Sequence, residues 1–207
     1  MVELYTSQGC SSCPPADALL HELAARDDVL PLALHVDYWD YIGWKDQFAK
    51  PSHTKRQKGY AHAGGRRMIY TPQMIIQGKE HVVGNHPQDV NKVLKRYKAA
   101  QPQIMLEAAR DGRKLQVKAA ALDGVSKGDA TVLLVRYNPS ETTRITRGEN
   151  AGKSIAYANI VHELKVVGKW DMRKPLELSV RSGPDLKSAV IIQRAGFGPI
   201  LAGVRVD

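Results

Sequence analysis

Cysteine is almost absent from this chain of 207 residues, which contains only Cys10 and Cys13. A single pair excludes a disulfide-rich scaffold, and it leaves a four-ligand zinc site two ligands short unless histidines or carboxylates supply them. Aromatic residues make up 6% of the chain, so a base-stacking platform for single-stranded nucleic acid is not expected. No apolar run is long enough to span a bilayer, so we expect no transmembrane segment.

The charge is strongly positive, with 30 Lys and Arg residues against 21 Asp and Glu. The basic residues are spread through most of the chain and no nucleic-acid-binding motif accompanies them, so we expect no nucleic-acid partner. We also expect no cofactor. The start of the chain has no charged and then apolar signal segment, but Met1 directly precedes the first predicted strand, and an upstream leader could have been removed. We expect a periplasmic or exported protein, with the cytoplasm as the alternative.

The two cysteines enclose Ser11 and Ser12, between a short apolar strand and a helix. Pro14 and Pro15 suit the first turn of that helix, and apolar residues recur at helical spacing after them. A strand-to-helix turn places the Cys10 sulfur at the helix N-terminus, where unpaired N–H groups stabilise a thiolate. Cys13 lies one turn further on and can attack a mixed disulfide formed by Cys10. The motif therefore predicts thiol–disulfide exchange with protein thiols or disulfides.

Three other uses of the same pair remain open. A structural zinc site would need two further ligands. A Cu(I) site, in a metal-binding or chaperone-like protein, would use the soft thiolates with a histidine such as His53 or His62. A binding module with an inert disulfide is the third, although a loop of so few residues restricts the unfolded chain little.

The residues after the motif predict an alternation of strands and helices. Val29–Val36 has the composition of a buried strand, an aromatic loop follows it, and residues 46–62 are predicted as a helix with a break at Pro51. The aromatic loop either covers the end of the sheet or forms a substrate groove beside the thiols. Thr71 and Pro72 then precede a strand at 74–76, a turn at Gly78, a partner strand at 81–84 and a helix at 87–100.

This order of elements resembles the thioredoxin fold across residues 1–100. Four segments also resemble an uncharacterised bacterial family, catalogued as domain of unknown function 1223, that has a thioredoxin-like N-terminal half and exported members: Val2–Asp17, His35–Asp40, Gly43–Asp46 and Tyr70–Gln73. The resemblance implies that Cys10 is the attacking cysteine and Cys13 the resolving one. It also implies that Pro72 is a cis-proline whose neighbouring backbone holds an extended substrate segment, and that Thr71 faces the sulfurs.

The chain departs from thioredoxin at two points. Leu4 replaces the buried aspartate that thioredoxin keeps six residues before its first cysteine, and the dipeptide between the cysteines is Ser-Ser rather than Gly-Pro. Glu3 is the nearest substitute: pointing inward it accepts the Cys13 proton, and pointing outward it pairs with a lysine. The other titratable candidates, each with a plain structural role as alternative, are Asp17, His35 and Asp37.

From residue 101 the sequence pattern changes to short segments of alternating apolar and polar residues, separated by Gly, Pro, Asn and Asp. Seven strands are predicted, at Ile104–Ala109, Lys114–Leu122, Ala130–Tyr137, Asn159–Val167, Leu176–Val180, Ala189–Arg194 and Ile200–Val206. They predict an α/β protein in which a thioredoxin-like domain of residues 1–100 precedes an antiparallel β-sandwich-like domain of residues 101–207. Arg147–Lys153 is glycine-rich but lacks the context of a phosphate-binding loop, so we interpret it as a hairpin connection.

Overall fold

The computed structural model describes residues 1–206 of the chain. Its elements, in chain order, are β1 (Val2–Thr6), α1 (Pro14–Ala24), β2 (Pro31–His35), the short 3₁₀ helix η1 (Asp40–Ile42), α2 (Pro51–Ala63), β3 (Gln73–Ile76), β4 (Glu80–Val83), α3 (Pro87–Lys98), β5 (Ile104–Asp111), β6 (Lys114–Ala121), β7 (Ala130–Arg144), β8 (Ser154–Trp170), β9 (Leu176–Arg181), β10 (Lys187–Arg194) and β11 (Ile200–Val206). Every strand predicted after residue 100 is present, and the loop at 147–153 joins β7 to β8.

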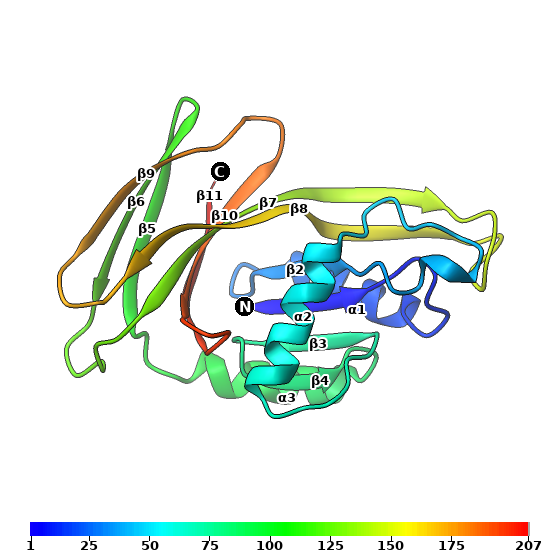
Figure 1. The fold of residues 1–207 in the computed structure, drawn as a ribbon, viewed down its shortest axis with the longest axis horizontal. Coiled ribbons are helices and arrows are strands. Elements are labelled where there is room, and N and C mark those ends of the chain that lie inside the picture. The colour runs from blue at the N-terminus through cyan, green and yellow to red at the C-terminus, as the bar shows by residue number, and fades with distance from the viewer. Residues whose placement is uncertain (207) are drawn as a thin grey trace.

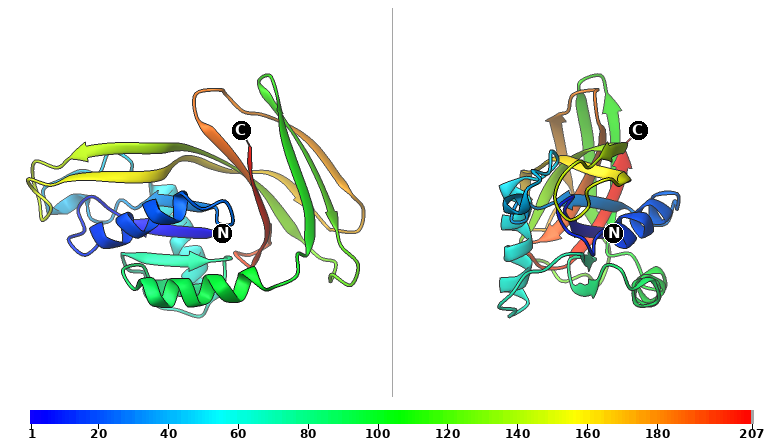
Figure 2. Two further views of the ribbon diagram at one scale, coloured as in Figure 1. Left: turned by 180° about the vertical axis from the view of Figure 1, so that it is seen from behind. Right: turned by 90° about the vertical axis from the view of Figure 1, so that its right-hand side faces the viewer.

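The N-terminal third forms a β-α-β start inside a mixed sheet. β1 pairs with β2 in parallel and with β3 in the antiparallel sense, and β4 lies at the edge beyond β3. Helices cover both faces of this part (Figures 1 and 2). The side chains of Val2 and Leu4 pack with α1 and α3, whereas Tyr5 packs with Tyr60 of α2. Because both faces are covered, every residue of β1 is buried.

The same sheet continues beyond residue 100. β8 lies parallel to β2, with Ala33 opposite Ile160, and the sheet then runs through β7 and β10 to β11, giving eight strands in all. Four of the seven strands predicted for the second half therefore extend the sheet that contains the CxxC strand. The side chains of residues 158–161 are all buried, as expected for a strand that lies inside a sheet.

The remaining strands, β5, β6 and β9, form a separate three-stranded antiparallel sheet. It packs over the far part of the large sheet around a core that includes Leu115, Val132, Trp170 and Ile192. At this end the molecule is a two-layer β structure, and at the other end it is a sheet with helices on both faces (Figure 1). No helix within residues 1–206 is long and apolar enough to cross a membrane.

A buried ion pair joins the first strand, α2 and the second half of the chain. Arg56 Nε donates to Glu3 Oε1 at 2.6 Å, and its Nη2 donates to the Tyr60 hydroxyl at 2.8 Å and to Gln193 Oε1 at 2.9 Å. The Tyr60 hydroxyl donates in turn to the Glu3 carboxylate. Glu3 therefore points inward, toward α2, and its carboxylate is fully engaged.

Replacing Arg56 with methionine is expected to lower the free energy of unfolding by about 3 to 5 kcal/mol, because it leaves the Glu3 carboxylate buried without its counter-ion. Urea unfolding at pH 7 measures the loss. The double variant Glu3→Gln/Arg56→Met should regain much of the stability, and Lys55→Met, an exposed change on the same helix, should alter it little. An Arg56→Met protein as stable as the Lys55→Met control would contradict this account.

Candidate functional site

The two cysteines form a disulfide at the N-terminus of α1. Their Cα atoms lie 5.4 Å apart. Cys13 is the N-cap of the helix, and its carbonyl oxygen accepts the N–H groups of Ala16 and Asp17 at 2.8 and 3.1 Å. The prediction that the motif lies in a strand-to-helix turn is thus confirmed. Two cysteines one turn apart at the start of a helix are thus close enough to form a disulfide.

The disulfide is buried, although the serines between the cysteines are exposed. Cys10 exposes 2% of its surface and Cys13 none. The nearest hydroxyl is that of Ser12, whose Oγ lies 3.4 Å from Cys10 Sγ. The oxidoreductase hypothesis favours an accessible Cys10, but a large disulfide substrate has no free approach to a sulfur this deeply buried.

The tip of the β7–β8 hairpin lies over the CxxC turn. Asn150, at this tip, is fully buried, and its Nδ2 donates to the carbonyl oxygens of Gln8 and Cys10, both at 2.9 Å. Lys153 Nζ holds the amide from the other side by donating to Asn150 Oδ1 at 2.9 Å. Gly148 lies against Trp44 so closely that an added Cβ would be 3.2 Å from the Trp44 Cβ. The hairpin tip and the start of α1 lie at the same end of the molecule in both views of its long axis (Figures 1 and 2).

Gln8 connects the turn to two other segments. Its backbone N–H donates to Asp46 Oδ2 at 2.8 Å, and its side chain accepts Trp44 Nε1 at 2.7 Å and donates to Thr143 Oγ1 at 3.3 Å. Gln8 is completely buried, so these bonds are sheltered from water and hold firmly. The segment before Cys10 is therefore fixed by the loop after β2 and by the hairpin.

A buried polar cluster lies on the α1 side of the sheet, next to the cysteines. Asp17 follows Cys13 by four residues, so both side chains lie on one face of α1. Thr6 and His35 are opposite each other on β1 and β2, and His35 Nδ1 bonds to Asp46 Oδ2 at 2.7 Å. Within residues 1–206, neither Asp17 oxygen nor His35 Nε2 has a hydrogen-bond partner at normal distance. These unpartnered polar atoms of the cluster can therefore bind a proton or a water molecule.

Burial raises the pKa of Asp17 to about 7, and the charge of His35 and the hydroxyl of Thr6 oppose that rise. For Asp46, burial also favours the neutral form, but the charge and hydrogen bond of His35 outweigh it and the pKa is lowered. Two carboxyl groups beside one histidine thus differ in their protonation near neutral pH. A carboxyl that titrates near pH 7 is suited to exchanging protons with a thiol.

The contribution of Asp17 to stability is expected to fall as the pH rises from about 4 to about 7, whereas buried His53, whose pKa is lowered to about 4, contributes in the opposite sense. In that range the folded protein keeps the Asp17 proton, whereas the unfolded chain has released it at its ordinary pKa of 3.8, so unfolding releases a proton and is favoured by higher pH. The folding constant then changes by up to about tenfold per pH unit. In urea unfolding between pH 4 and pH 8, the free energy of unfolding of the wild type minus that of Asp17→Asn should fall with this slope. The exposed change Asp27→Asn is the matched control, and an unchanged slope in Asp17→Asn would contradict the assignment.

Thr71 and Pro72 are tied to the CxxC turn through Trp39. The peptide bond between Thr71 and Pro72 is cis, and Trp39 Nε1 donates to Thr71 Oγ1 at 2.7 Å. Trp39 also packs on Gly9, where an added Cβ would be 3.2 Å from the Trp39 Cβ. Tyr41 stacks on Trp39 with ring centroids 6.5 Å apart and exposes 80% of its surface. Trp39 of the aromatic loop thus contacts both Thr71 and Gly9, the residue before Cys10.

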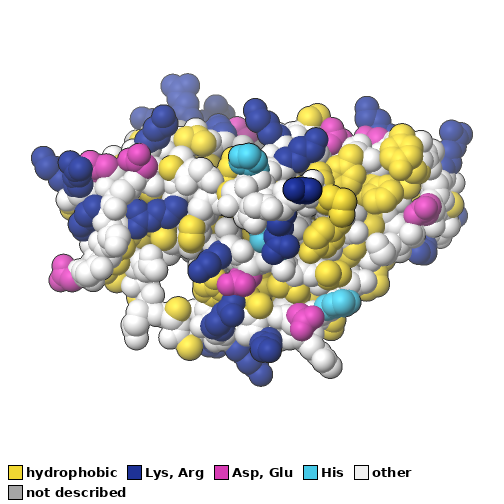
Figure 3. Space-filling view, turned by 60° about the horizontal axis from the view of Figure 1, so that its bottom comes forward, with side chains coloured by type: hydrophobic (Ala, Val, Ile, Leu, Met, Phe, Trp, Pro, Cys, Tyr) yellow, Lys and Arg dark blue, Asp and Glu magenta, His cyan; other side chains and the backbone are white. Residues whose placement is uncertain are grey.

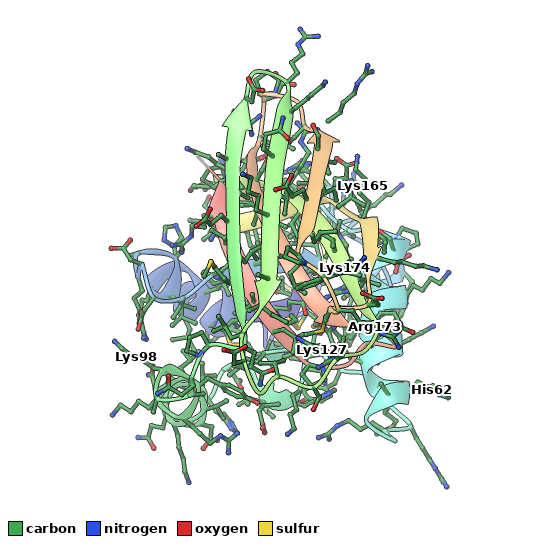
Figure 4. All side chains as sticks on the ribbon, turned by 90° about the vertical axis from the view of Figure 1, so that its left-hand side faces the viewer. His62, Lys98, Lys127, Lys165, Arg173 and Lys174 are labelled. Atoms are coloured by element: carbon green, nitrogen blue, oxygen red, sulfur yellow. A yellow bond between two sulfur atoms is a disulfide. The ribbon has the colours of Figure 1, made fainter. Side chains whose placement is uncertain are left out.

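Other residues named from the sequence have structural contacts. Glu3 pairs with Arg56 on the α2 side, away from the α1 side where Asp17 lies, and Asp37 accepts the Thr54 hydroxyl at 2.5 Å. His62 lies at the exposed end of α2 (Figure 4). Among residues 1–206, no three His, Cys, Asp or Glu side chains lie close enough together to hold a metal ion. On the face shown in Figure 3, Lys and Arg are dispersed among apolar and polar side chains rather than gathered in one stripe.

Sequence reasoning missed three residues of this site, namely Gln8, Asp46 and Asn150. Asn150 reaches the turn from 140 residues away, inside a loop that we interpreted as a hairpin connection. The only local signal was that this loop is short of apolar residues, which is common to most hairpin loops. A contact across such a separation follows from the packing of the hairpin and from nothing in its own sequence.

The comparisons with known proteins agree with this architecture. A family model described as "Protein of unknown function (DUF1223)" matches residues 1–193. The solved structure of protein AGR_C_4864 from Agrobacterium tumefaciens is 31% identical, with a TM-score of 0.84 over 99% of this chain and 91% of that one. HBP35 of Porphyromonas gingivalis is 12% identical, with a TM-score of 0.65 over 99% and 73%, a likeness of fold alone. No curated protein matches the sequence. The chain belongs to the DUF1223 family, whose function is unknown.

Proposed function

We propose that this protein is a thiol–disulfide oxidoreductase that exchanges disulfides with protein substrates through Cys10 and Cys13. The observation that carries the proposal is the disulfide between these two residues at the N-terminus of α1. The helix N-terminus favours the thiolate that results when the disulfide opens. The neighbouring topology, with β1 between β2 and β3 and helices on both faces, supports the resemblance to the thioredoxin fold.

In the reducing direction, the Cys10 thiolate attacks one sulfur of a substrate disulfide and displaces the other as a thiolate. The Cys13 thiol then loses its proton and attacks Cys10 Sγ, which releases the second substrate sulfur and closes the Cys10–Cys13 disulfide. Two electrons pass from the protein to the substrate. The oxidising direction is the same sequence in reverse, and the redox potential decides between the two.

Asp17 is the proton acceptor that we propose for Cys13. It shares a helix face with Cys13 and is 2% exposed, its pKa is raised by burial to about 7, and its oxygens have no hydrogen-bond partner at normal distance among residues 1–206. Glu3, the candidate named from the sequence, is a weaker acceptor because Arg56 and Tyr60 already occupy its oxygens. The charge of His35 favours the charged form of Asp17, whereas the charge of Asp46 opposes it.

The Thr71–Pro72 segment is the proposed docking site for the extended backbone of the substrate. Trp39 positions Thr71 by a hydrogen bond, and the exposed ring of Tyr41 beside it offers an apolar surface. An aromatic surface next to a reactive disulfide suits a partly unfolded substrate, whose apolar side chains are not yet buried.

The direct test is turnover of a disulfide-containing peptide with glutathione as the second redox couple. Quenching with acid and separating the species by mass should reveal a mixed disulfide between the peptide and Cys10, formed faster than glutathione alone exchanges with the peptide. Failure of the protein to exceed that background, with its own disulfide shown to be reduced, would overturn the proposal.

A further inference from the structure

A basic hollow lies away from the cysteines, where the β5–β6 turn and the β9–β10 loop face the middle of the β7–β8 hairpin. Its volume is about 600 Å³, and its charged lining consists of Arg113, Lys114, Arg136, Glu163, Lys165 and Arg181. The β5–β6 turn and the β9–β10 loop form its upper rim at the top of Figure 1. Lys165 lies on the β9 side of the small sheet in Figure 4. The size is in the range of sites for small ligands.

The charges around the basic hollow do not balance. Five cations face one carboxylate, and Glu163 is shared, with Lys165 Nζ at 2.7 Å and Arg136 Nη1 at 3.7 Å. Lys114 and Arg181 are direct partners across the β6–β9 ladder, a placement that costs stability between like charges. Asp111 is opposite Lys114 on β5, but no ion pair joins these two among residues 1–206.

Arg136 is the best-placed cation at the floor of the basic hollow. Its side chain is 19% exposed, and its Nε is buried without a hydrogen-bond partner in the described part of the chain. The guanidinium lies against the backbone of the β9–β10 loop, where a Cβ on Gly183 would be 3.0 Å from Nη2. The exposed part of this planar guanidinium can present its forked donors to the oxygens of an oxyanion in the hollow.

We propose that the basic hollow binds a small oxyanion that carries at least two phosphate groups, held between Arg136 at the floor and Arg113, Lys165 and Arg181 at the rim. Phosphate groups match the four uncompensated positive charges, and their oxygens accept the forked donors of arginine. The same chemistry can come from a free polyphosphate or from a phospholipid headgroup. The inference does not depend on the proposed redox function, since the site contains no cysteine.

Calorimetric titration with inorganic tripolyphosphate in 50 mM salt tests the proposal, and a second arm measures sedimentation with vesicles containing cardiolipin, whose headgroup carries two phosphate groups. We expect saturable binding to tripolyphosphate that weakens as salt is added. The variant Arg113→Gln/Arg181→Gln should weaken it at least about tenfold, since it removes two charge-assisted contacts. Both residues are exposed, so this variant is expected to fold. Arg136→Gln should have a similar effect. If the protein binds the vesicles and the same variants abolish that binding, the ligand is a phospholipid headgroup. If the protein binds tripolyphosphate but not the vesicles, the ligand is a free phosphate compound.

The control is Lys92→Gln/Lys95→Gln, which removes the same charge from the exposed surface of α3. It should leave binding within about twofold of the wild type, because it lies outside the hollow. Equal weakening by both double variants would mean that net charge alone attracts the ligand, and would overturn the proposal. Absence of saturable binding in both arms would overturn it as well.

Discussion

Replacing Cys10 with serine is expected to reduce disulfide exchange to the rate of glutathione alone, because no thiolate then attacks the substrate. Replacing Cys13 with serine should have a different result. Cys10 still forms the mixed disulfide, but nothing resolves it, so the adduct should accumulate and be visible by mass. The measurement is the same peptide turnover assay, run with each variant.

Stability is the control for these two variants. Opening the disulfide removes a constraint on a very short loop, for which the chain-entropy relation gives about 2 kcal/mol, so both variants should lose similar stability and still fold. A Cys10→Ser protein that retains exchange would show that the activity comes from another group. Equal accumulation of the mixed disulfide in both variants would contradict the division of roles between the cysteines.

Replacing Asn150 with alanine is expected to expose the disulfide. The change removes both hydrogen bonds that hold the hairpin tip on the turn, to the carbonyl oxygens of Gln8 and Cys10. The hairpin tip should then open more often, and reduction of the disulfide by dithiothreitol should proceed at least about tenfold faster, a change equivalent to about 1.4 kcal/mol in the opening equilibrium. The free energy of unfolding should fall by about 1 to 3 kcal/mol, because two buried carbonyl groups lose their donor.

Glu149→Ala is the matched control, since Glu149 is exposed at the same tip and has no ion pair among residues 1–206. It should leave both the reduction rate and the stability close to the wild-type values. If Asn150→Ala loses stability but is reduced no faster than Glu149→Ala, the hairpin tip stabilises the fold without controlling access to Cys10.

The features that sequence reasoning predicted correctly depend on short separations along the chain. The CxxC motif spans only four residues, and Pro14 and Pro15 indicate the start of α1. The strands after residue 100 were predicted from the alternation of apolar and polar residues and from the turn residues between them. Alternation could not decide which way Glu3 points, because every residue of β1 is buried and a doubly covered strand carries no period of two.

The features that it missed depend on contacts between distant segments. The pairing of β8 with β2 joins Ile160 to Ala33, so the second half extends the first sheet instead of standing apart from it. Because of this pairing, the β7–β8 hairpin extends along the sheet to the CxxC turn, where the Asn150 side chain donates a hydrogen bond to the Cys10 carbonyl oxygen. The local sequence around each contact does not indicate its partner, because both contacts depend on the packing of the whole sheet.

The central claim is that the Cys10–Cys13 pair is redox-active, and a titration in glutathione buffers with thiol trapping tests it most directly. The account predicts a reversible two-electron transition at a potential between about −270 and −120 mV, the range of disulfide-exchange proteins, and the value shows whether the protein reduces or oxidises its substrates. The transition should be the same with Cu(I) present. A pair that stays oxidised well below about −300 mV is a structural disulfide, and a pair that Cu(I) keeps reduced and protected from trapping is a metal site. Either result would contradict the account.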